Sequence, residues 1–357
     1  MTTAPLSARP RVLVYGVGEI GRGVARLLRQ RGYPVVGAVD TDARLRGVEL
    51  GDVLGEAPFG LRITDDPGPL LRRGLADVAI HATSAPGPDF RALAGQLEGM
   101  IRAGIHVISL SGVFDLSRVA PDVGREVDAL ARAHDVTVLG VGLNPGLLLD
   151  VAPLLFTGAC QAVTQVRGSR VVDCSLWGPF LLRRYGIGLE EAEFRRETAA
   201  GRLVLHAPME QSVSLIGHGL GWSLDTIVHD RQPVIARLER SGAHVRVKPG
   251  QVAGFRHVAR ATHAGRDAVV LELGGAVAPQ AAEDGLEPGT RFTIEGTPGI
   301  TVEITGGILT GEGAYAATVA RPVNTIPYVL RAPRGLTRVS ELPVIAAAWP
   351  SPGAQPA

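Results

Sequence analysis

Short apolar runs alternate with amphipathic stretches over the first 145 residues of the chain. The runs have the length and β-branched content of buried strands and lie at 12–15, 35–39, 77–81, 106–110 and 136–141. The stretches between them have apolar residues at helical spacing and lie at 19–31, 90–103 and 121–134, with a further helix predicted over 66–74. Strands that alternate with helices predict an α/β domain with a doubly wound parallel sheet.

The second part of the chain has a different pattern, in which strands follow one another with glycine-containing turns between them. The predicted strands are 163–174, 227–238, 243–247, 254–262, 268–274, 291–295 and 300–304, and the predicted helices are 147–159, 189–200, 211–220 and 314–330. This pattern predicts a second, α+β domain with a mostly antiparallel open sheet. We therefore expect one domain over 11–145, a second over 146–311, and a C-terminal segment over 312–345 that packs back on the first.

A glycine motif follows the first predicted strand. Gly16, Gly18 and Gly21 have GxGxxG spacing and open the helix predicted over 19–31. Such glycines allow a tight turn, close approach of a pyrophosphate to the helix N-terminus, and close packing of helix on strand. Asp40 ends the second strand about 20 residues later, where a carboxylate binds a ribose diol. This context predicts a dinucleotide-binding Rossmann domain; a glycine turn that only packs, or a methyl-donor nucleotide site, are the alternatives.

Further cofactor contacts are expected at the carboxyl ends of the strands, where ligands of doubly wound sheets lie. For His81, which ends the third strand, a hydrogen-bonded structural role is the commoner alternative to catalysis. Asp40 favours NADH, because a carboxylate repels a 2′-phosphate, whereas Arg44 can attract that phosphate, so we expect NAD(P)H with a preference for NADH. The predicted cofactor-binding residues are Gly16, Gly18, Glu19, Ile20, Gly21, Asp40, Arg44, His81, Ala82, Thr83, Ser84 and Asn144.

The composition excludes several classes of partner. The 357 residues carry a formal net charge of +1 without a basic run, so no nucleic-acid or anionic-membrane partner is expected. Cys160 and Cys174 have neither CxxC spacing nor histidines in ligand register, so no metal site is predicted. No run of about 18 apolar residues and no signal-like start are present, so we expect a soluble cytoplasmic protein. Hydrolase and kinase motifs are absent as well.

Eight segments, spaced along nearly the whole chain, form a more specific pattern. They are Gly16-Val-Gly-Glu-Ile-Gly21, Val39-Asp-Thr-Asp42, His81-Ala-Thr-Ser84, Val138-Leu-Gly-Val-Gly-Leu-Asn-Pro-Gly146, Arg170-Val-Val-Asp173, Leu220-Gly-Trp222, Glu295-Gly-Thr-Pro298 and Val323-Asn-Thr-Ile-Pro327. In this order they resemble the 2,4-diaminopentanoate dehydrogenase and native amine dehydrogenase family, itself distantly similar to dihydrodipicolinate reductase. The resemblance implies a Rossmann domain, a substrate domain that forms a homodimer, and NAD(P)-dependent interconversion of an amine with an imine or with a ketone and ammonia.

One run departs from the family pattern. The family typically has a Ser-Thr-Cys-Glu-Glu-like run, and a glutamate there is taken to bind and deprotonate ammonia or the amine. Here the run is Ser109-Leu-Ser-Gly-Val-Phe114, and Asp115 is the nearest carboxylate. Loss of that acid removes the group suited to building an imine from ammonia, whereas hydride transfer needs only the cofactor and its orientation.

The departure favours a preformed imine as substrate, because glycine and valine in place of glutamate leave a larger and drier pocket. The predicted function is therefore an imine reductase on an amine dehydrogenase-like scaffold, acting on a small-molecule imine, amine or ketone. An amine dehydrogenase or carbonyl reductase with a displaced acid, and a non-catalytic nucleotide-binding protein, are the alternatives. The predicted catalytic residues are Tyr185, Asp115 and Asp173, with His106 as a further candidate proton donor. The predicted pocket residues are Ser111, Gly112, Val113, Leu147, Trp177 and Phe180, for which core packing is the alternative role.

Overall fold

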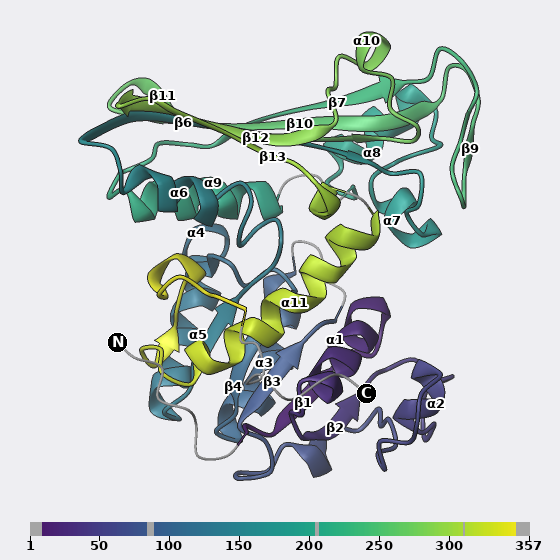
Figure 1. Cartoon of the computed structure of the whole chain (residues 1–357), viewed down its shortest axis with the longest axis vertical. Helices are drawn as coiled ribbons and strands as arrows, with labels where there is room; N and C mark the ends of the chain where they lie inside the picture. The colour runs from purple at the N-terminus through teal and green to yellow at the C-terminus, as the bar shows by residue number, and fades with distance from the viewer. Residues whose placement is uncertain (1–8, 84–88, 204–206, 310, 348–357) are drawn as a thin grey trace. The chain divides into compact units, whose positions relative to one another are not determined.

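The structure, a computed structural model, describes residues 9–83, 89–203, 207–309 and 311–347. The chain divides into two compact units, residues 1–142 with 315–357, and residues 143–314. Each unit contains one six-stranded sheet (Figure 1).

The sheet of the first unit is parallel throughout, with the strand order β14-β5-β4-β3-β1-β2. Its strands are β1 (Val12–Tyr15), β2 (Val35–Val39), β3 (Val78–His81), β4 (His106–Ser109), β5 (Thr137–Gly140) and β14 (Gly335–Leu336). The predicted doubly wound sheet is thereby confirmed. Only β14 was not predicted, because a two-residue strand has no apolar periodicity of its own.

Helices cover this parallel sheet. They are α1 (Glu19–Gln30), α2 (Leu50–Leu54), α3 (Phe90–Arg102), α4 (Leu116–Val119) and α5 (Pro121–Ala133), with 3₁₀ turns η1 (Gly68–Leu70) and η3 (Val339–Glu341). The helix predicted over 66–74 is wrong, since only η1 forms there. Proline and glycine dominate that segment, and both disfavour an α-helix interior.

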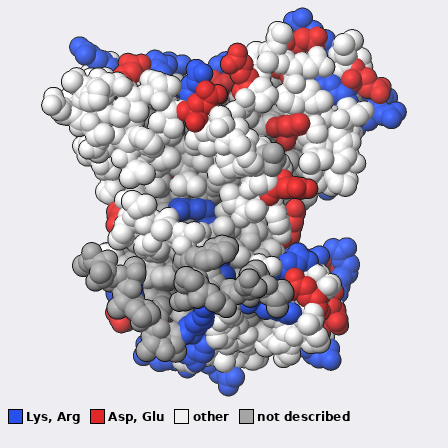
Figure 2. Space-filling view, in the orientation of Figure 1, with Lys and Arg blue, Asp and Glu red and all other residues white. Residues whose placement is uncertain are grey.

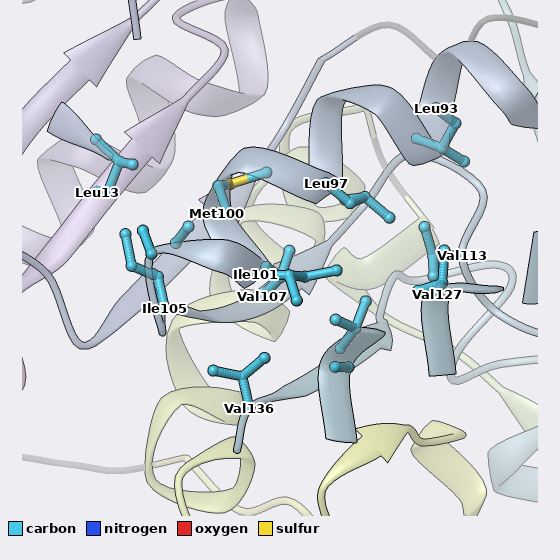
Figure 3. Packing of buried hydrophobic residues seen from close by; sticks show 14 of the residues in the cluster. Leu13, Leu93, Leu97, Met100, Ile101, Ile105, Val107, Val113, Val127 and Val136 are labelled. Carbon is cyan, nitrogen blue, oxygen red and sulfur yellow. The ribbon is translucent and has the colours of Figure 1, made fainter. Parts of the chain in front are cut away.

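Apolar residues of α3 form the centre of the first unit's core. Leu93, Leu97, Met100 and Ile101 recur at helical spacing and are at most 1% exposed. They pack with residues of β4 and β5, including Val107 (Figure 3). Each such side chain contributes roughly 1.5–3 kcal/mol by leaving water.

The long helix α11 (Gly311–Val329) joins the first unit from Tyr315 onward. It packs against α1 at Gly23, where an added Cβ would lie 2.4 Å from the Tyr315 hydroxyl oxygen. That hydroxyl also donates to the Glu19 carbonyl oxygen at 3.1 Å. The glycine therefore allows close packing here, because an added Cβ would have to displace the Tyr315 hydroxyl and a Val319 methyl group.

The second unit has a mixed sheet with the order β13-β12-β6-β11-β10-β7. Its strands are β6 (Ala162–Asp173), β7 (Val228–Ile235), β10 (Val252–His263), β11 (Arg266–Ala276), β12 (Gly289–Thr297) and β13 (Ile300–Ile304). Only β6 and β11 pair in parallel, so the predicted mostly antiparallel sheet is confirmed. The strand predicted over 243–247 shrinks to β9 (Arg246–Val247), which pairs with β8 (Arg240–Ser241) in a separate ribbon.

The helices of the second unit are α6 (Val151–Thr157), α7 (Pro179–Arg184), α8 (Glu191–Ala199), α9 (Ala207–Gly219) and α10 (Ala281–Asp284), with a 3₁₀ turn η2 (Gly307–Leu309). Helices α6 and α9 lie against one face of the sheet (Figure 1). The prediction that α6 begins at Leu147 is wrong. It begins at Val151, because the Asp150 carboxylate accepts from the Val151 N–H at 2.7 Å and caps the helix there.

The surface carries charges of both signs. On the face shown in Figure 2, acidic and basic side chains are mixed, in keeping with the net charge of +1. Within the described ranges, no helix combines the length and the apolar character needed to cross a bilayer.

Candidate cofactor and substrate sites

The glycine turn between β1 and α1 has the geometry that its sequence predicts. Gly16 has φ +104°, and an added Cβ would lie 2.6 Å from the Ala82 carbonyl oxygen. An added Cβ on Gly21 would lie 1.8 Å from the Gly16 carbonyl oxygen, so helix and turn pack directly. By contrast, no atom lies within 4 Å of the Cβ position of Gly18. The start of α1 is therefore open to a ligand at Gly18, with Glu19 exposed and Ile20 half-buried beside it.

Asp40 holds the glycine turn in place. Its Oδ2 accepts from the Val17 N–H at 2.6 Å, and its Oδ1 accepts from the Asp42 N–H at 2.8 Å. Asp40 lies directly after β2 and is half-buried. Because each carboxylate oxygen can accept more than one hydrogen bond, Asp40 can bind a ribose diol while it fixes the turn.

Arg44 lies on the surface and pairs with Asp42 rather than with the turn. Its Nη2 is 2.6 Å from Asp42 Oδ2, and the arginine side chain is 88% exposed. This pairing lowers the pKa of Asp42 to about 2. A 2′-phosphate would have to replace Asp42 at Arg44, which weakens the sequence argument for NADPH.

A buried polar network occupies the carboxyl ends of β3 and β4. His81 Nε2 lies 2.8 Å from Gln96 Oε1, and His81 Nδ1 lies 3.0 Å from Ser109 Oγ. Thr83 Oγ1 donates to Gln96 Oε1 at 2.9 Å, and Ser111 Oγ donates to the Thr83 carbonyl oxygen at 2.7 Å. His81 is fully buried, and burial lowers its pKa to about 4, so it is neutral near pH 7.

The polar network links the ends of β3 and β4 to α3. Both ring nitrogens of His81 have hydrogen-bond partners, as the structural alternative for this residue requires. The network fixes the backbone of Ala82 and Thr83 against Gly16. Ser84 lies outside the described residues. Gln96 was missed, because it lies in the middle of α3 and nothing in the helix periodicity distinguishes it from a surface residue.

The run from Ser109 to Phe114 forms a buried loop after β4. Gly112 has φ +93°, and the nearest atom to its Cβ position is Leu93 Cδ2 at 4.0 Å. Val113 is 1% exposed and points into the apolar core beside Val127 (Figure 3). The loop thus carries no carboxylate, and its valine packs in the core.

Asp115, the nearest carboxylate to this loop, is engaged elsewhere in the first unit. It is 4% exposed, and its Oδ1 lies 3.1 Å from Arg338 Nε. Ser117 also donates to the same oxygen. His106, the further candidate donor, accepts from the Thr137 N–H at 3.0 Å, and burial lowers its pKa to about 4.

Asn144 lies in a loop that Asp150 organises within the second unit. The Asp150 carboxylate is fully buried and accepts from the Gly146 N–H at 2.9 Å and from Ser212 Oγ at 2.7 Å. Asn144 Oδ1 is buried without a hydrogen-bond partner among the described residues. An oriented, unsatisfied amide oxygen of this kind suits a ligand donor such as a carboxamide N–H. Sequence reasoning missed Asp150, although an aspartate before an apolar run is an N-cap signal.

An aromatic cluster in the second unit contains Tyr185. Its ring centroid lies 5.2 Å from that of Trp177 and 4.6 Å from that of Phe255. Burial raises the pKa of Tyr185 to about 12, so its hydroxyl stays protonated at working pH. Phe180 lies on the surface, 51% exposed, with the Arg184 guanidinium 5.5 Å from its ring centroid.

Two of the remaining predicted site residues, Asp173 and Leu147, are at least partly exposed to solvent. Asp173 is exposed at the end of β6 and accepts from the Ser175 N–H at 2.8 Å. Leu147 is half-buried in the turn that precedes α6. No cluster of three or more His, Cys, Asp or Glu side chains that could hold a metal is found in the part of the chain that the structure describes.

Comparison with known proteins identifies the family. Residues 147–352 match the family model described as the 2,4-diaminopentanoate dehydrogenase C-terminal domain. The chain belongs to the 2,4-diaminopentanoate dehydrogenase family. It is 28% identical over 344 residues to the 2,4-diaminopentanoate dehydrogenase of Acetoanaerobium sticklandii, covering 94% of this chain and 93% of the relative. It is also 24% identical over 348 residues to an amine dehydrogenase of Streptomyces virginiae, covering 93% of this chain and 96% of the relative.

A solved structure of an amine dehydrogenase from Mycobacterium smegmatis has the same fold. It matches with a TM-score of 0.82 and 25% identity, over 95% of this chain and 98% of that one. The family resemblance inferred from the eight segments is therefore confirmed. The chain is an oxidoreductase of a family whose named relatives here are a diaminopentanoate dehydrogenase and amine dehydrogenases.

Proposed function

We propose that the protein is an NAD(P)H-dependent imine reductase, which reduces a C=N bond that reaches it already formed. When bound, the nicotinamide supplies the hydride that forms the new C–H bond, and a proton completes the amine at nitrogen. The single observation that carries the choice of a preformed imine is the loop 109–114, which holds no carboxylate and is followed by an aspartate paired with Arg338.

The residues of the first unit fit a dinucleotide. The open Cβ position of Gly18 leaves room for a pyrophosphate at the N-terminus of α1, where backbone N–H groups and the helix dipole favour an anion. Asp40 supports the preference for NADH, because its fixed carboxylate would repel a 2′-phosphate. The engagement of Arg44 with Asp42 points in the same direction.

Loss of the loop carboxylate affects the activation of ammonia, but it does not affect hydride transfer. Ammonia is mostly protonated near neutral pH, so a base must take its proton before it attacks a ketone. Asp115 would have to leave both Arg338 and the Ser117 hydroxyl, which hold its carboxylate within the first unit, to act as that base. An imine or iminium needs no such step.

Among the three predicted catalytic residues, Tyr185 is the one that we propose as the proton donor. Asp115 is paired with Arg338, and Asp173 is exposed at a strand end. The Tyr185 ring is held by two aromatic neighbours, and its raised pKa keeps the hydroxyl protonated. We expect Tyr185→Phe to lower kcat by about 100-fold, the low end for loss of a general acid, while the aromatic packing is kept. A change of less than about threefold would remove Tyr185 from the mechanism.

Two other functions share much of this support. An amine dehydrogenase with a displaced acid fits the same fold, and the relatives' names favour it. A non-catalytic nucleotide-binding protein would need only the glycine turn.

A homodimer that forms through the second unit and a cytoplasmic location stay predictions from the sequence. Sedimentation of a monomer at micromolar concentration would contradict the predicted dimer.

A panel of substrates separates the three functions. NADH oxidation is followed with cyclic imines, with ketones plus ammonium, and with ketones alone, and the products are identified by mass spectrometry. Reduction of imines with poor use of ammonium supports the proposal. Efficient use of ammonium indicates an amine dehydrogenase, and binding of NADH without oxidation by any substrate indicates a nucleotide-binding protein.

A further inference from the structure

The buried carboxylate of Asp150 joins three segments of the second unit. Its Oδ1 accepts from the Val151 N–H at 2.7 Å, at the start of α6. Its Oδ2 accepts from the Gly146 N–H at 2.9 Å, in the loop before α6, and from the Ser212 hydroxyl of α9 at 2.7 Å. Asp150 and Ser212 are both fully buried. The carboxylate therefore ties the loop 143–150 to both helices.

Capping of α6 alone does not explain this aspartate. Asp89 caps α3 from an exposed position, where its Oδ1 accepts from the Ala92 N–H at 2.9 Å. Neutral serine and asparagine cap a helix about as well as aspartate does. A fully buried carboxylate costs desolvation free energy that its hydrogen bonds have to offset. The two bonds beyond the cap, to the loop and to α9, therefore indicate that Asp150 fixes the loop.

The loop that Asp150 fixes contains an unsatisfied acceptor. Asn144 Oδ1 is buried and has no hydrogen-bond partner among the described residues. The loop is held at two further points, since the Leu148 N–H donates to the Leu143 carbonyl oxygen at 3.0 Å and Leu149 is buried in the apolar cluster that includes residues of α9. A buried acceptor without a donor is uncommon in a folded protein and is explained when a ligand supplies the donor.

The position of Asn144 in the chain indicates which ligand that is. Strand β5 ends at Gly140, and Asn144 follows four residues later. Ligands of doubly wound sheets lie outside the carboxyl ends of the strands. The proposed cofactor has a nicotinamide carboxamide, whose NH₂ group is a donor that an amide oxygen can accept.

We propose that Asp150 and Ser212 are positioning residues for the cofactor, and that they hold Asn144 Oδ1 where it accepts from the carboxamide N–H of the nicotinamide. This inference rests on the nicotinamide cofactor of the proposed function and adds how the ring is oriented. A carboxamide held by a hydrogen bond fixes which face of the ring meets the substrate. An aspartate suits this role because its two oxygens accept from several donors at once.

Cofactor analogues test the hydrogen bond by calorimetric binding, without any turnover. The probes are NAD⁺, its thionicotinamide analogue, which keeps the N–H, and its 3-acetylpyridine analogue, which has a methyl group in place of the NH₂. On the unmodified protein we expect NAD⁺ and the thionicotinamide analogue to bind about equally, and the acetylpyridine analogue to bind about tenfold more weakly. We call this last ratio of dissociation constants the amide preference.

Four variants assign the amide preference to residues. Asn144→Ala removes the acceptor and should lower the preference from about tenfold to about one. Asp150→Asn keeps the side-chain size and can still cap α6, but it loses an acceptor oxygen, so the preference should fall to about threefold or less. Ser212→Ala should lower it in the same direction. Asp89→Asn is the matched control at an exposed cap and should leave it at about tenfold.

A ratio of two dissociation constants on one preparation separates positioning from folding, because a smaller folded fraction changes both constants alike. If Asp150→Asn does not fold, Ser212→Ala and Asn144→Ala still carry the test. Equal binding of NAD⁺ and the acetylpyridine analogue by the unmodified protein would overturn the inference. A preference that survives in Asn144→Ala would also overturn it, and one that survives in both Asp150→Asn and Ser212→Ala would reduce Asp150 to a helix cap.

The same experiments distinguish this inference from the proposed function. If the amide preference changes as expected but no imine oxidises NADH, the proposed function fails and this inference stands. If imines are reduced but the unmodified protein shows no amide preference, only this inference fails.

Discussion

The two units handle buried polar groups in different ways. In the first unit, His81, Gln96, Ser109 and Thr83 hydrogen-bond one another at the ends of β3 and β4. In the second unit, Arg170 has a hydroxyl as its one hydrogen-bond partner among the described residues. A satisfied network stiffens the turn that would hold a cofactor, whereas a buried guanidinium without an anion is unfavourable. The buried polar groups of the first unit thus satisfy one another, whereas Arg170 in the second unit has no ion-pair partner among the described residues.

The largest expected effect comes from unbalancing a charge that is now paired. Asp284→Asn would leave the buried Arg240 guanidinium with only Glu283, 4.0 Å away, as an anion, whereas the side chains of Arg240 and Asp284 are now each 1% exposed. We expect the free energy of unfolding to fall by about 3–5 kcal/mol, measured by urea denaturation. Asp267→Asn, at a partly exposed pair with Arg260, is the control and should cost less than about 1 kcal/mol. Equal losses of unfolding free energy in the two variants would mean that burial does not determine how strongly an ion pair stabilises the fold.

The next effect concerns the polar network of the first unit at low pH. The pKa of His81 is lowered from 6.5 to about 4, so the unfolded chain binds a proton more readily than the folded one. Stability should therefore be full above pH 6.5 and fall as the pH drops towards 4, by up to about 3 kcal/mol from His81. His81→Asn should reduce the change in the free energy of unfolding between pH 6.5 and pH 4. His106 has the same sign of shift, so His106→Asn should flatten another part, and no change in slope for His81→Asn would contradict the assignment.

A glutamate restored to the loop after β4 tests the missing acid. Val113→Glu would place a carboxylate in the core, so Gly112 is the better position. Gly112→Glu has open space but a backbone at φ +93°, and we expect a cost of about 1–2 kcal/mol. The rate with a ketone and ammonium should rise relative to that with an imine. Gly112→Gln, which has the same shape without the base, is the control, and an equal gain for both variants would argue against general-base action.

The smallest expected effect is on cofactor choice. Asp40→Ala removes the carboxylate that fixes Val17 N–H and that would repel a 2′-phosphate. We expect the ratio of kcat/KM for NADH over NADPH to fall by about tenfold, which corresponds to about 1.4 kcal/mol. Asp42→Ala, which frees Arg44, should shift the ratio less. An unchanged ratio in Asp40→Ala would remove Asp40 from the ribose site.

The sequence predicted those features that depend on neighbours along the chain. The strand, glycine turn and helix around Gly16 are local, and so is the alternation that produces both sheets. Asp150 was missed because the apolar periodicity of residues 147–159 predicted one continuous helix, whereas the Asp150 carboxylate accepts hydrogen bonds in a turn before α6. Arg170 could not be recognised as a buried cation, because its neighbours are determined only when β6 pairs with β11 and β12, more than 95 residues away.

The central claim is that a C=N bond is reduced only when it arrives already formed. The direct test compares kcat/KM of the unmodified protein, at saturating NADH, for 2-methyl-1-pyrroline and for butanone with excess ammonium. The account predicts a ratio of at least about 100 in favour of the imine, since no base is placed to activate ammonia. A ratio near or below unity would contradict it, and would show that another side chain has taken the place of the missing glutamate.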